Sequence, residues 1–475
     1  MRAQTSEAIR KRIDHPVIDA DGHVIEFVPA AMDHLRDLAG PTAVRALWDH
    51  YRAASKMRGR SVEERRRDGS PRMTWWAYPA RNALDRATGM LPALLHQRLG
   101  DMGIDFSVLY PTAGGVGQTL EDGELRQAVC RAFNRFHAEE YGPYADRLTV
   151  AALIPMFSPE EAIRELEYSV RELGFKAVLL SGYVPRPLPG HNSHRWARWL
   201  DNFVLDSLYD YDPLWERFVD LGVVPVFHPV GMGWGGRISV TNYVFNHLGN
   251  FAGNDAICRA VFMSGVLRRF PTLRFAFLEG GAGWACSLYA DLIAHWEKRN
   301  RDQVENYNPA NIDRKLVVDL FRRHGSPRFR EHLEDLEEAL AVLSDPDEDP
   351  LARDEFAACK IQRAEDIRDL FAEHFHFGCE ADDPITGAAF DTARNPFGAR
   401  MRAILGSDIA HWDVPDMSAI LREAWELVER KLLTEEDFRD FGFANAVHLY
   451  TGANPRFFEG TLVEDAVSRE LAGKR

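Results

Sequence analysis

The sequence predicts an α/β protein with the fold of a (β/α)₈ TIM barrel that carries helical insertions. Eight short apolar runs recur along the 475 residues, and amphipathic segments lie between them. An open doubly wound sheet is the alternative fold. It is less favoured because neither a GxGxxG nor a GxxxxGK[ST] loop follows the first apolar run.

The predicted strands are continuous apolar runs, which is the pattern of strands buried on both faces. Residues 159–173 (PEEAIRELEYSVREL) illustrate the intervening helices, because Ile163, Leu166 and Val170 recur there at helical spacing. The eight runs are residues 17–24, 106–110, 148–154, 175–180, 223–227, 273–278, 375–378 and 403–405.

Three stretches exceed what a minimal barrel needs, namely residues 30–95, 186–212 and 296–370. Long insertions in compact folds tend to be lids, binding loops or oligomer arms. Strand signals resume after each stretch, so we interpret residues 1–475 as one domain with decorations. The helical stretch at 296–370 would suit the arm of a homodimer.

The amino-acid composition indicates a globular protein and argues against nucleic-acid binding. Hydrophobic residues make up 45% and charged residues 27%, as in globular proteins, and the net charge of −15 argues against a broad nucleic-acid-binding surface. A small-molecule substrate, including an anionic one, remains compatible with this charge. Five scattered cysteines without a CxxC pair, a polar N-terminus and no long apolar run predict a cytoplasmic protein that does not enter a membrane.

Polar residues that can bind a metal stand where predicted strands end. Asp21 and His23 lie at i, i+2 on the first strand, His228 follows the fifth, and Asp408 follows the eighth. The carboxyl ends of barrel strands meet at one mouth, where two imidazoles and two carboxylates suit a borderline divalent ion and leave room for water. Each residue alone also has a structural interpretation, as a turn pair, a hydrogen-bonded core histidine or a helix N-cap.

The set of motifs resembles the amidohydrolase superfamily and, within it, the amidohydrolase-2 family, which includes aminocarboxymuconate semialdehyde and resorcylate-type decarboxylases. The resemblance extends from about residue 16 to about residue 460. Its motifs are residues 19–26 (DADGHVIE), 228–229 (HP), 269–281 (RFPTLRFAFLEGG), 406–413 (GSDIAHWD) and 445–450 (NAVHLY).

The resemblance implies a mononuclear site formed by Asp21, His23, His228 and Asp408. Two departures make the pocket more acidic: Asp21 replaces the first histidine of a His-x-His motif, and Glu279 replaces the histidine of a His-Gly-Gly motif. The expected cofactor is one divalent ion. Zn²⁺ is the first expectation, and the added carboxylate makes Mn²⁺ and Mg²⁺ the alternatives.

Three residues are predicted to be catalytic. Asp408 would take a proton as well as bind the ion, and Glu279 would be a general acid or base whose pKa burial raises. The alternative interpretation is that Glu279 pairs with an arginine or caps the Gly-Gly turn. His411 would orient a ligand or bind a substrate oxyanion, with core packing as an equal alternative. Glu26 is expected to make a structural hydrogen bond.

Candidate substrate contacts come from the loops. Arg237 follows a glycine-rich loop and is a possible clamp for a carboxylate, and Trp75 and Trp76 would form an aromatic wall or only pack their insertion. His247 lies in a segment that the pattern does not assign, so ligand, substrate-contact and surface interpretations all remain open.

Two reactions compete for such a site. The first is hydrolysis of a small cyclic or aromatic carboxylate-type substrate by a metal-activated water. The alternative is non-oxidative decarboxylation of an aromatic or muconate-like acid, against which the replacement by Glu279 counts. A barrel that only binds ligands is disfavoured, because all four ligand types are retained.

Overall fold

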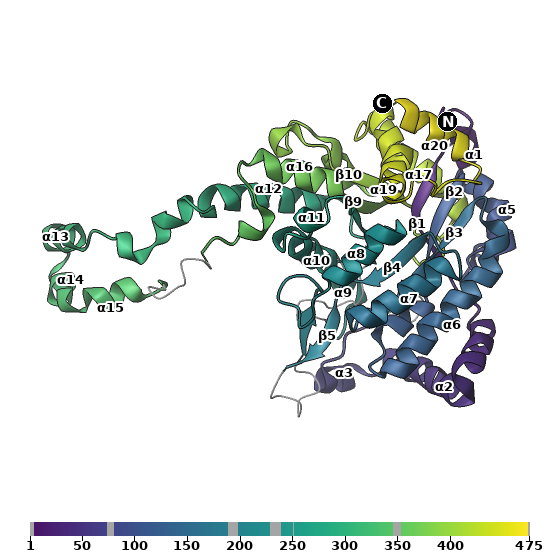
Figure 1. Ribbon diagram of the computed structural model, residues 1–475, viewed down its shortest axis with the longest axis horizontal. Coiled ribbons are helices and arrows are strands. Elements are labelled where there is room, and N and C mark those ends of the chain that lie inside the picture. Colours follow the sequence, from purple (N-terminus) through teal and green to yellow (C-terminus); the bar gives the residue numbers. More distant parts are fainter. Residues whose placement is uncertain are drawn as a thin grey trace.

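The computed structural model describes residues 4–73, 80–188, 198–228, 239–249, 251–344 and 353–473. A sheet of eight parallel strands in the order β1-β2-β3-β4-β7-β8-β9-β10 forms its centre and curves into a nearly closed barrel (Figure 1). The predicted barrel is therefore confirmed, and each of the eight apolar runs overlaps one strand of the sheet. The strands are β1 (Ile18–Val24), β2 (Phe106–Pro111), β3 (Leu148–Ile154), β4 (Ala177–Ser181), β7 (Val226–His228), β8 (Phe275–Phe277), β9 (Phe375–Glu380) and β10 (Arg402–Gly406).

The strands are apolar throughout because both of their faces are covered. Every residue of β1 and β2 is buried. In β3, Val150 and Ala152 belong to one hydrophobic cluster, whereas Ala151 and Leu153 belong to another. A strand that contributes alternate residues to two cores has no polar face, which explains the continuous runs in the sequence.

Helices surround the barrel. In α7, Ser158 accepts a hydrogen bond from the backbone N–H of Glu161 as N-cap, Pro159 begins the helix, and Ala162 and Leu166 are buried. The helices around the strands are α1 (Ser6–Arg10), α6 (Gly123–Tyr141), α7 (Pro159–Arg171), α8 (Asp212–Leu221), α9 (Tyr243–His247), α10 (Ala252–Met263), α11 (Val266–Arg269), α12 (Gly283–Arg299), α16 (Glu365–His374), α17 (Ile420–Glu429), α18 (Glu435–Arg439), α19 (Asn445–Ala453) and α20 (Glu464–Gly473).

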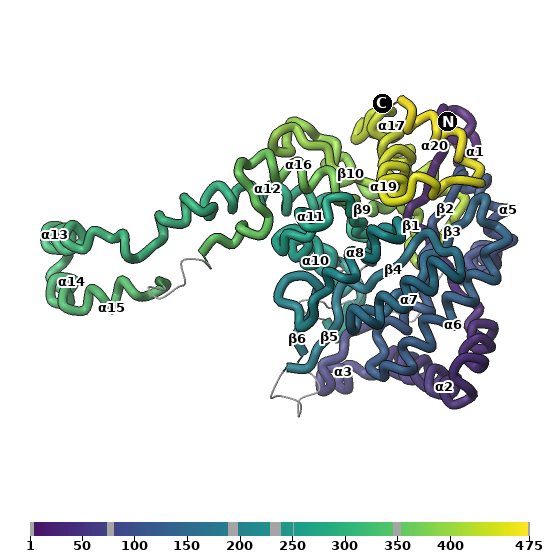
Figure 2. Tube along the Cα trace, in the orientation of Figure 1, coloured from purple at the N-terminus to yellow at the C-terminus, as the bar shows by residue number. Residues whose placement is uncertain are grey.

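The three predicted insertions contain their own elements. Residues 30–95 are mostly helical, the second stretch includes a two-stranded antiparallel pair, and part of the third projects from the barrel (Figures 1 and 2). We propose that all three decorate one domain, because strands of the same sheet follow each of them. Their elements are α2 (Val28–Arg58), α3 (Val62–Asp68), α4 (Ala83–Thr88), α5 (Pro92–Met102), β5 (Val184–Pro187), β6 (Arg198–Asp201), α13 (Arg314–His324), α14 (Pro327–Glu331) and α15 (Leu336–Ala341).

Within the described ranges, none of the helices has both the length and the apolar character needed to cross a bilayer.

Candidate metal centre

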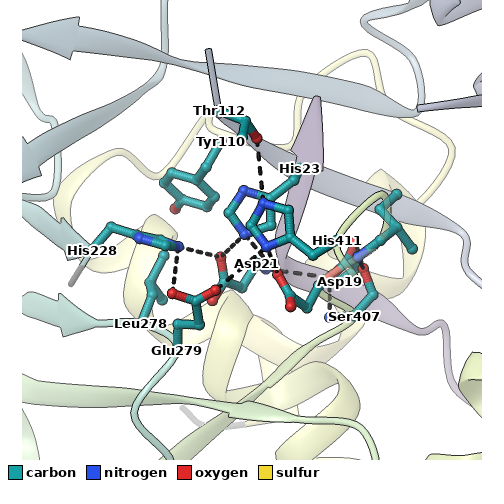
Figure 3. Close-up of polar contacts among 12 residues, drawn as sticks. Asp19, Asp21, His23, Tyr110, Thr112, His228, Leu278, Glu279, Ser407 and His411 are labelled. Atoms are coloured by element: carbon teal, nitrogen blue, oxygen red, sulfur yellow. Dashed lines mark hydrogen bonds and ion pairs between the residues drawn. The ribbon is translucent and has the colours of Figure 1, made fainter. Parts of the chain in front are cut away.

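Three side chains predicted from the sequence, Asp21, His23 and His228, converge at the carboxyl ends of the strands (Figure 3), and the fourth, Asp408, contacts His23. Asp21 and His23 lie on β1, His228 ends β7, and Asp408 follows β10. The Nε2 atom of His23 lies 2.9 Å from Oδ1 of Asp408 and 3.8 Å from Oδ1 of Asp21. The Nε2 atom of His228 lies 3.9 Å from the same Asp21 oxygen. The structure therefore brings these residues together, although they are far apart in sequence.

The polar atoms of this cluster suit a cation. Asp21 Oδ1, both ring nitrogens of His23, His228 Nε2 and both carboxylate oxygens of Asp408 are buried and lack a hydrogen bond of regular geometry, although His23 Nε2 and His411 Nδ1 lie 2.9 and 2.6 Å from Asp408 Oδ1. Ligand atoms of Asp21, His23 and His228 lie within 4.8 Å of one another. Buried polar atoms are normally paired, so a group of unpaired donors facing one point fits a divalent ion.

The electrostatics of the cluster agree with this interpretation. Burial, with the neighbouring charges of Glu279 and Asp408, raises the pKa of Asp21 well above its usual value. Burial, with the neighbouring imidazoles of His411 and His228, lowers the pKa of His23 well below its usual value. A divalent cation would stabilise both the ionised carboxylates and the neutral imidazoles, because metal ligands must be deprotonated.

Glu279 and His411 lie beside the four candidate ligands. The Nδ1 atom of His411 is 2.6 Å from Asp408 Oδ1 and 3.5 Å from Glu279 Oε1, and Glu279 Oε2 is 3.6 Å from His228 Nε2. The His411 ring stacks on that of His23 with 3.7 Å between the ring centroids. His411 thus contacts both carboxylates and is not a separate core residue.

The pKa of Glu279 differs in direction from the sequence expectation. Burial raises it, but the charge of His228 and the hydrogen bond from His411 outweigh burial and hold the pKa of Glu279 below its usual value. Burial likewise lowers the pKa of His411, and Asp408 and Glu279 outweigh it, so that the pKa of His411 lies well above its usual value. The direction for Glu279 is thus opposite to the one that burial alone would give, because two imidazoles lie beside this carboxylate.

Asp19, to which the sequence assigned no role, holds the segments around the candidate metal centre together through hydrogen bonds. Its carboxylate accepts hydrogen bonds from the Ser107 hydroxyl at 2.6 Å, the Ser407 hydroxyl at 2.7 Å and the Ser407 backbone N–H at 2.9 Å. A Cβ on Gly22 would lie 2.5 Å from Asp19 Oδ2, which explains the glycine in the motif. Asp19 thereby joins β1 to β2 and to the loop that carries Asp408.

Replacement of Asp19 by alanine is expected to destabilise the fold by about 1–3 kcal/mol, because it leaves buried donors of Ser107 and Ser407 unpaired. Urea unfolding followed by circular dichroism would measure the change. The exposed Asp33→Ala variant is the control, and equal stability of both variants would contradict the prediction.

Glu26 has the structural role that the sequence predicted. Its carboxylate accepts hydrogen bonds from the backbone N–H groups of Ala113 and Gly114 at 2.8 and 2.9 Å. It therefore holds the loop after β2. That loop also carries Thr112, whose hydroxyl lies 3.4 Å from His411 Nε2.

The backbone is left-handed at two of the reactive residues. Glu279 has φ 54° and Asp408 has φ 48°, and Ala410 next to His411 has φ 76°. Such conformations are uncommon outside glycine, and they persist where the surrounding structure imposes them. The backbone N–H of Asp408 donates to the carbonyl of Asp21 at 2.9 Å, which is one such constraint.

A cavity of about 350 Å³ opens beside the centre and is lined by His247, Glu279 and Glu380 together with Asp382 and Asp383. The structure thus brings His247 to the mouth, where its ring lies 5.4 Å from that of Trp412. Asp382 and Asp383, which follow β9, also border the mouth.

Among the described residues, carboxylates dominate the wall of this cavity. Burial, with the charges of Asp413 and Asp408, raises the pKa of Glu380 to about 8. The three other predicted substrate contacts, Trp75, Trp76 and Arg237, lie outside the described residues.

A nearly closed parallel barrel with a buried histidine–carboxylate cluster at the carboxyl ends of its strands defines an enzyme of the (β/α)₈ class. The chain belongs to the amidohydrolase family, whose sequence model matches residues 18–342. This confirms the resemblance seen in the sequence.

Two curated relatives are decarboxylases. The gamma-resorcylate decarboxylase of Polaromonas sp. strain JS666 is 31% identical over 233 residues, which cover 48% of this chain and 64% of that protein. The decarboxylase orsB of Emericella nidulans is 28% identical over 169 residues, which cover 34% of this chain and 46% of that protein. The matched region thus spans less than two thirds of either relative.

A solved amidohydrolase shares the fold. An amidohydrolase from Mycobacterium avium subsp. paratuberculosis K-10 superposes with a TM-score of 0.51 at 17% identity, covering 92% of this chain and 100% of that one. A dihydroxybenzoic acid decarboxylase from Polaromonas sp. JS666, solved with manganese and 2-nitroresorcinol, gives a TM-score of 0.47 at 16% identity, covering 92% and 97%.

Proposed function

We propose that this enzyme is a metal-dependent, non-oxidative decarboxylase of a hydroxylated aromatic acid. The observation that carries the proposal is the group of buried ligand atoms without a regular hydrogen bond on Asp21, His23, His228 and Asp408. The reaction is inferred from the 31% identity to a gamma-resorcylate decarboxylase. Hydrolysis, which was the first expectation from the sequence, is now the alternative reaction that the experiment must exclude.

Asp21, His23, His228 and Asp408 would hold one divalent ion. When bound, the ion would supply positive charge that orients and polarises the oxygens of the substrate. Zn²⁺ remains compatible with this donor set. The carboxylates of Asp21, Asp408 and nearby Glu279 favour a harder ion, so we propose Mn²⁺ ahead of Zn²⁺ and Mg²⁺.

His411, with Asp408 and Glu279, would transfer the proton that the reaction requires. Decarboxylation breaks the bond between the ring and the carboxyl carbon, releases CO₂ and leaves an electron pair on the ring carbon, which must accept a proton. His411 lies within 2.6 Å of Asp408 and 3.5 Å of Glu279, so it can supply that proton through either carboxylate. This imidazole compensates for the histidine that Glu279 replaces.

The test offers the metal-loaded enzyme hydroxylated benzoic acids together with their methyl esters and amides. We expect CO₂ from the free acids, with one decarboxylated ring product for each CO₂, and no acid release from esters or amides. Acid release without CO₂ would make the enzyme a hydrolase. Full metal occupancy without any turnover would contradict an enzymatic role for these substrate classes.

Metal removal provides a second readout that does not depend on the substrate. Dialysis against a chelator is expected to lower the thermal midpoint, and adding Mn²⁺ is expected to restore it, because an ion that binds only the folded state stabilises that state. The Mn²⁺ and Zn²⁺ contents of the purified enzyme, measured by mass spectrometry, would identify the ion. An unchanged midpoint after complete metal removal would contradict the proposed site.

A further inference from the structure

A strongly basic cavity lies where α2 ends and α3 begins, at the lower edge of the view in Figure 1. Its volume is about 700 Å³, and we call it the arginine cavity. Its lining consists of Arg58, Arg60, Arg65 and Arg72 with Ser55, Gly59, Ser61 and Val62. Among the described residues, none lines both this cavity and the one beside the candidate metal centre. The chain therefore offers a second place for a ligand.

The basic character of this region is local. Residues 56–72 contain seven Lys or Arg residues and three acidic ones, whereas the whole chain has a net charge of −15. Arg66 and Arg67 of this run are exposed on α3. The other four arginines of the run all line the arginine cavity. A solvated helix face accounts for the first two, but not for four guanidinium groups around one hollow.

Arg65 is the most deeply buried of the four arginines, at 5% exposed. Its Nε atom donates to the carbonyl of Val240 at 2.6 Å, and its Nη1 atom donates to the carbonyl of Arg60. These carbonyls accept hydrogen bonds but carry no net charge. Among the described residues, the only ion pair of the four arginines joins Arg60 to Asp68 at 2.6 Å. Buried charges in proteins are normally paired, so the cavity holds positive charge that an anion would balance.

The charge and the size of the cavity indicate a phosphorylated small molecule. Guanidinium groups bind phosphate oxygens through paired, charge-assisted hydrogen bonds. Four arginines and Asp68 give a net charge of +3, whereas one phosphate ester carries about −1.5 to −2 at pH 7. Two phosphoryl groups therefore balance the cavity better than one. The volume is in the range of small-molecule sites, and the net charge of the chain disfavours nucleic acid and anionic membranes.

We propose that the arginine cavity binds a small molecule that carries a diphosphate group. The site goes beyond the proposed decarboxylation and does not depend on it, because it uses none of the candidate metal ligands.

Hydrogen bonds connect this cavity to the mouth of the metal centre. The backbone N–H of Arg72 donates to the carbonyl of Ser239 at 2.9 Å, and Asn246 Nδ2 donates to the carbonyl of Arg72 at 3.1 Å. Asn246 lies in α9, and the last residue of that helix, His247, lines the mouth. A ligand that holds Arg65 and Arg72 would therefore also stabilise α9.

The first test is calorimetric titration of the full-length protein with inorganic diphosphate. We expect binding that the Arg58→Gln/Arg72→Gln variant weakens by at least about 10²-fold, because two charge-assisted hydrogen-bonding groups are lost. The control, Arg52→Gln, removes an arginine of α2 that is 59% exposed outside the cavity, and it should bind normally. No binding by the unaltered protein, or equal binding by the double variant, would overturn the proposal. Equal thermal midpoints of the variants would exclude unfolding.

The second test separates the arginine cavity from the metal centre, since diphosphate also binds divalent ions. The Asp408→Asn variant, which we expect to lack the ion, should bind diphosphate as the unaltered protein does. Hydrogen exchange should slow in residues 58–72 and 239–246 when diphosphate is added, because Arg65 and Arg72 contact the second segment. Loss of binding in Asp408→Asn, or protection confined to residues 380–383 at the mouth, would place the ligand at the metal and overturn the proposal.

The third test concerns the source of the phosphate groups. A short single-stranded DNA and phosphatidylserine vesicles are each titrated into the unaltered protein and into Arg58→Gln/Arg72→Gln. We expect both to bind at least about 10-fold more weakly than diphosphate. Equally tight binding of either that requires the two arginines would assign the cavity to a macromolecular phosphate and overturn the proposal of a small ligand.

Discussion

Asp408→Asn is expected to remove the bound divalent ion and to lower kcat by at least about 10³-fold. Asp408 is 3% exposed, and its Oδ1 atom contacts both the Nε2 atom of His23 and the Nδ1 atom of His411. An amide has the same shape but no negative charge, so the variant would lose a ligand and the partner of His411 together. Metal content by mass spectrometry and turnover by CO₂ release would measure the two losses.

The matched control for this variant is Asp49→Asn, which removes one negative charge from a side chain that is 73% exposed. It should retain metal and turnover. If Asp408→Asn kept a stoichiometric ion and normal turnover, Asp408 would be neither ligand nor catalytic residue. The proposed centre would then have to be abandoned.

The candidate ligands were predictable because their signals are local. Asp21, His23 and His228 stand at the ends of continuous apolar runs, and the geometry of a parallel barrel brings such ends together. Asp408 follows the last run in the same way. Periodicity and strand order thus sufficed for the fold and for the position of the four residues.

Other features depend on contacts between distant segments. Asp19 is buried by Ser107 and Ser407, which lie 88 and 388 residues away in the chain, so no local pattern indicates its role. The pKa of Glu279 could not be predicted either, because its direction depends on two imidazoles that the fold places beside it. The sequence predicted a helical stretch suited to an arm at residues 296–370, and part of it projects from the barrel (Figure 1).

His411→Gln is expected to keep the ion and yet lower kcat by about 10²–10⁴-fold, the usual contribution of a general acid or base. The reason is geometric: His411 Nδ1 reaches Asp408 and Glu279, whereas the four proposed ligands do not include His411. Metal content and CO₂ release, measured on the same sample, separate this result from that of Asp408→Asn. Loss of the ion from His411→Gln would instead make His411 a ligand.

The Glu279→Gln variant, alone and combined with His411→Gln, tests whether Glu279 and His411 act on the same proton. If His411 and Glu279 pass one proton between them, removing either residue disables the same step, and the double variant should be no slower than the slower single variant. If Glu279 instead contacts the substrate independently, the two losses in kcat/KM should multiply. A multiplicative result would leave His411 with Asp408 as its only proton partner, because Asp408 lies 0.9 Å closer to its Nδ1 atom than Glu279 does, at 2.6 against 3.5 Å.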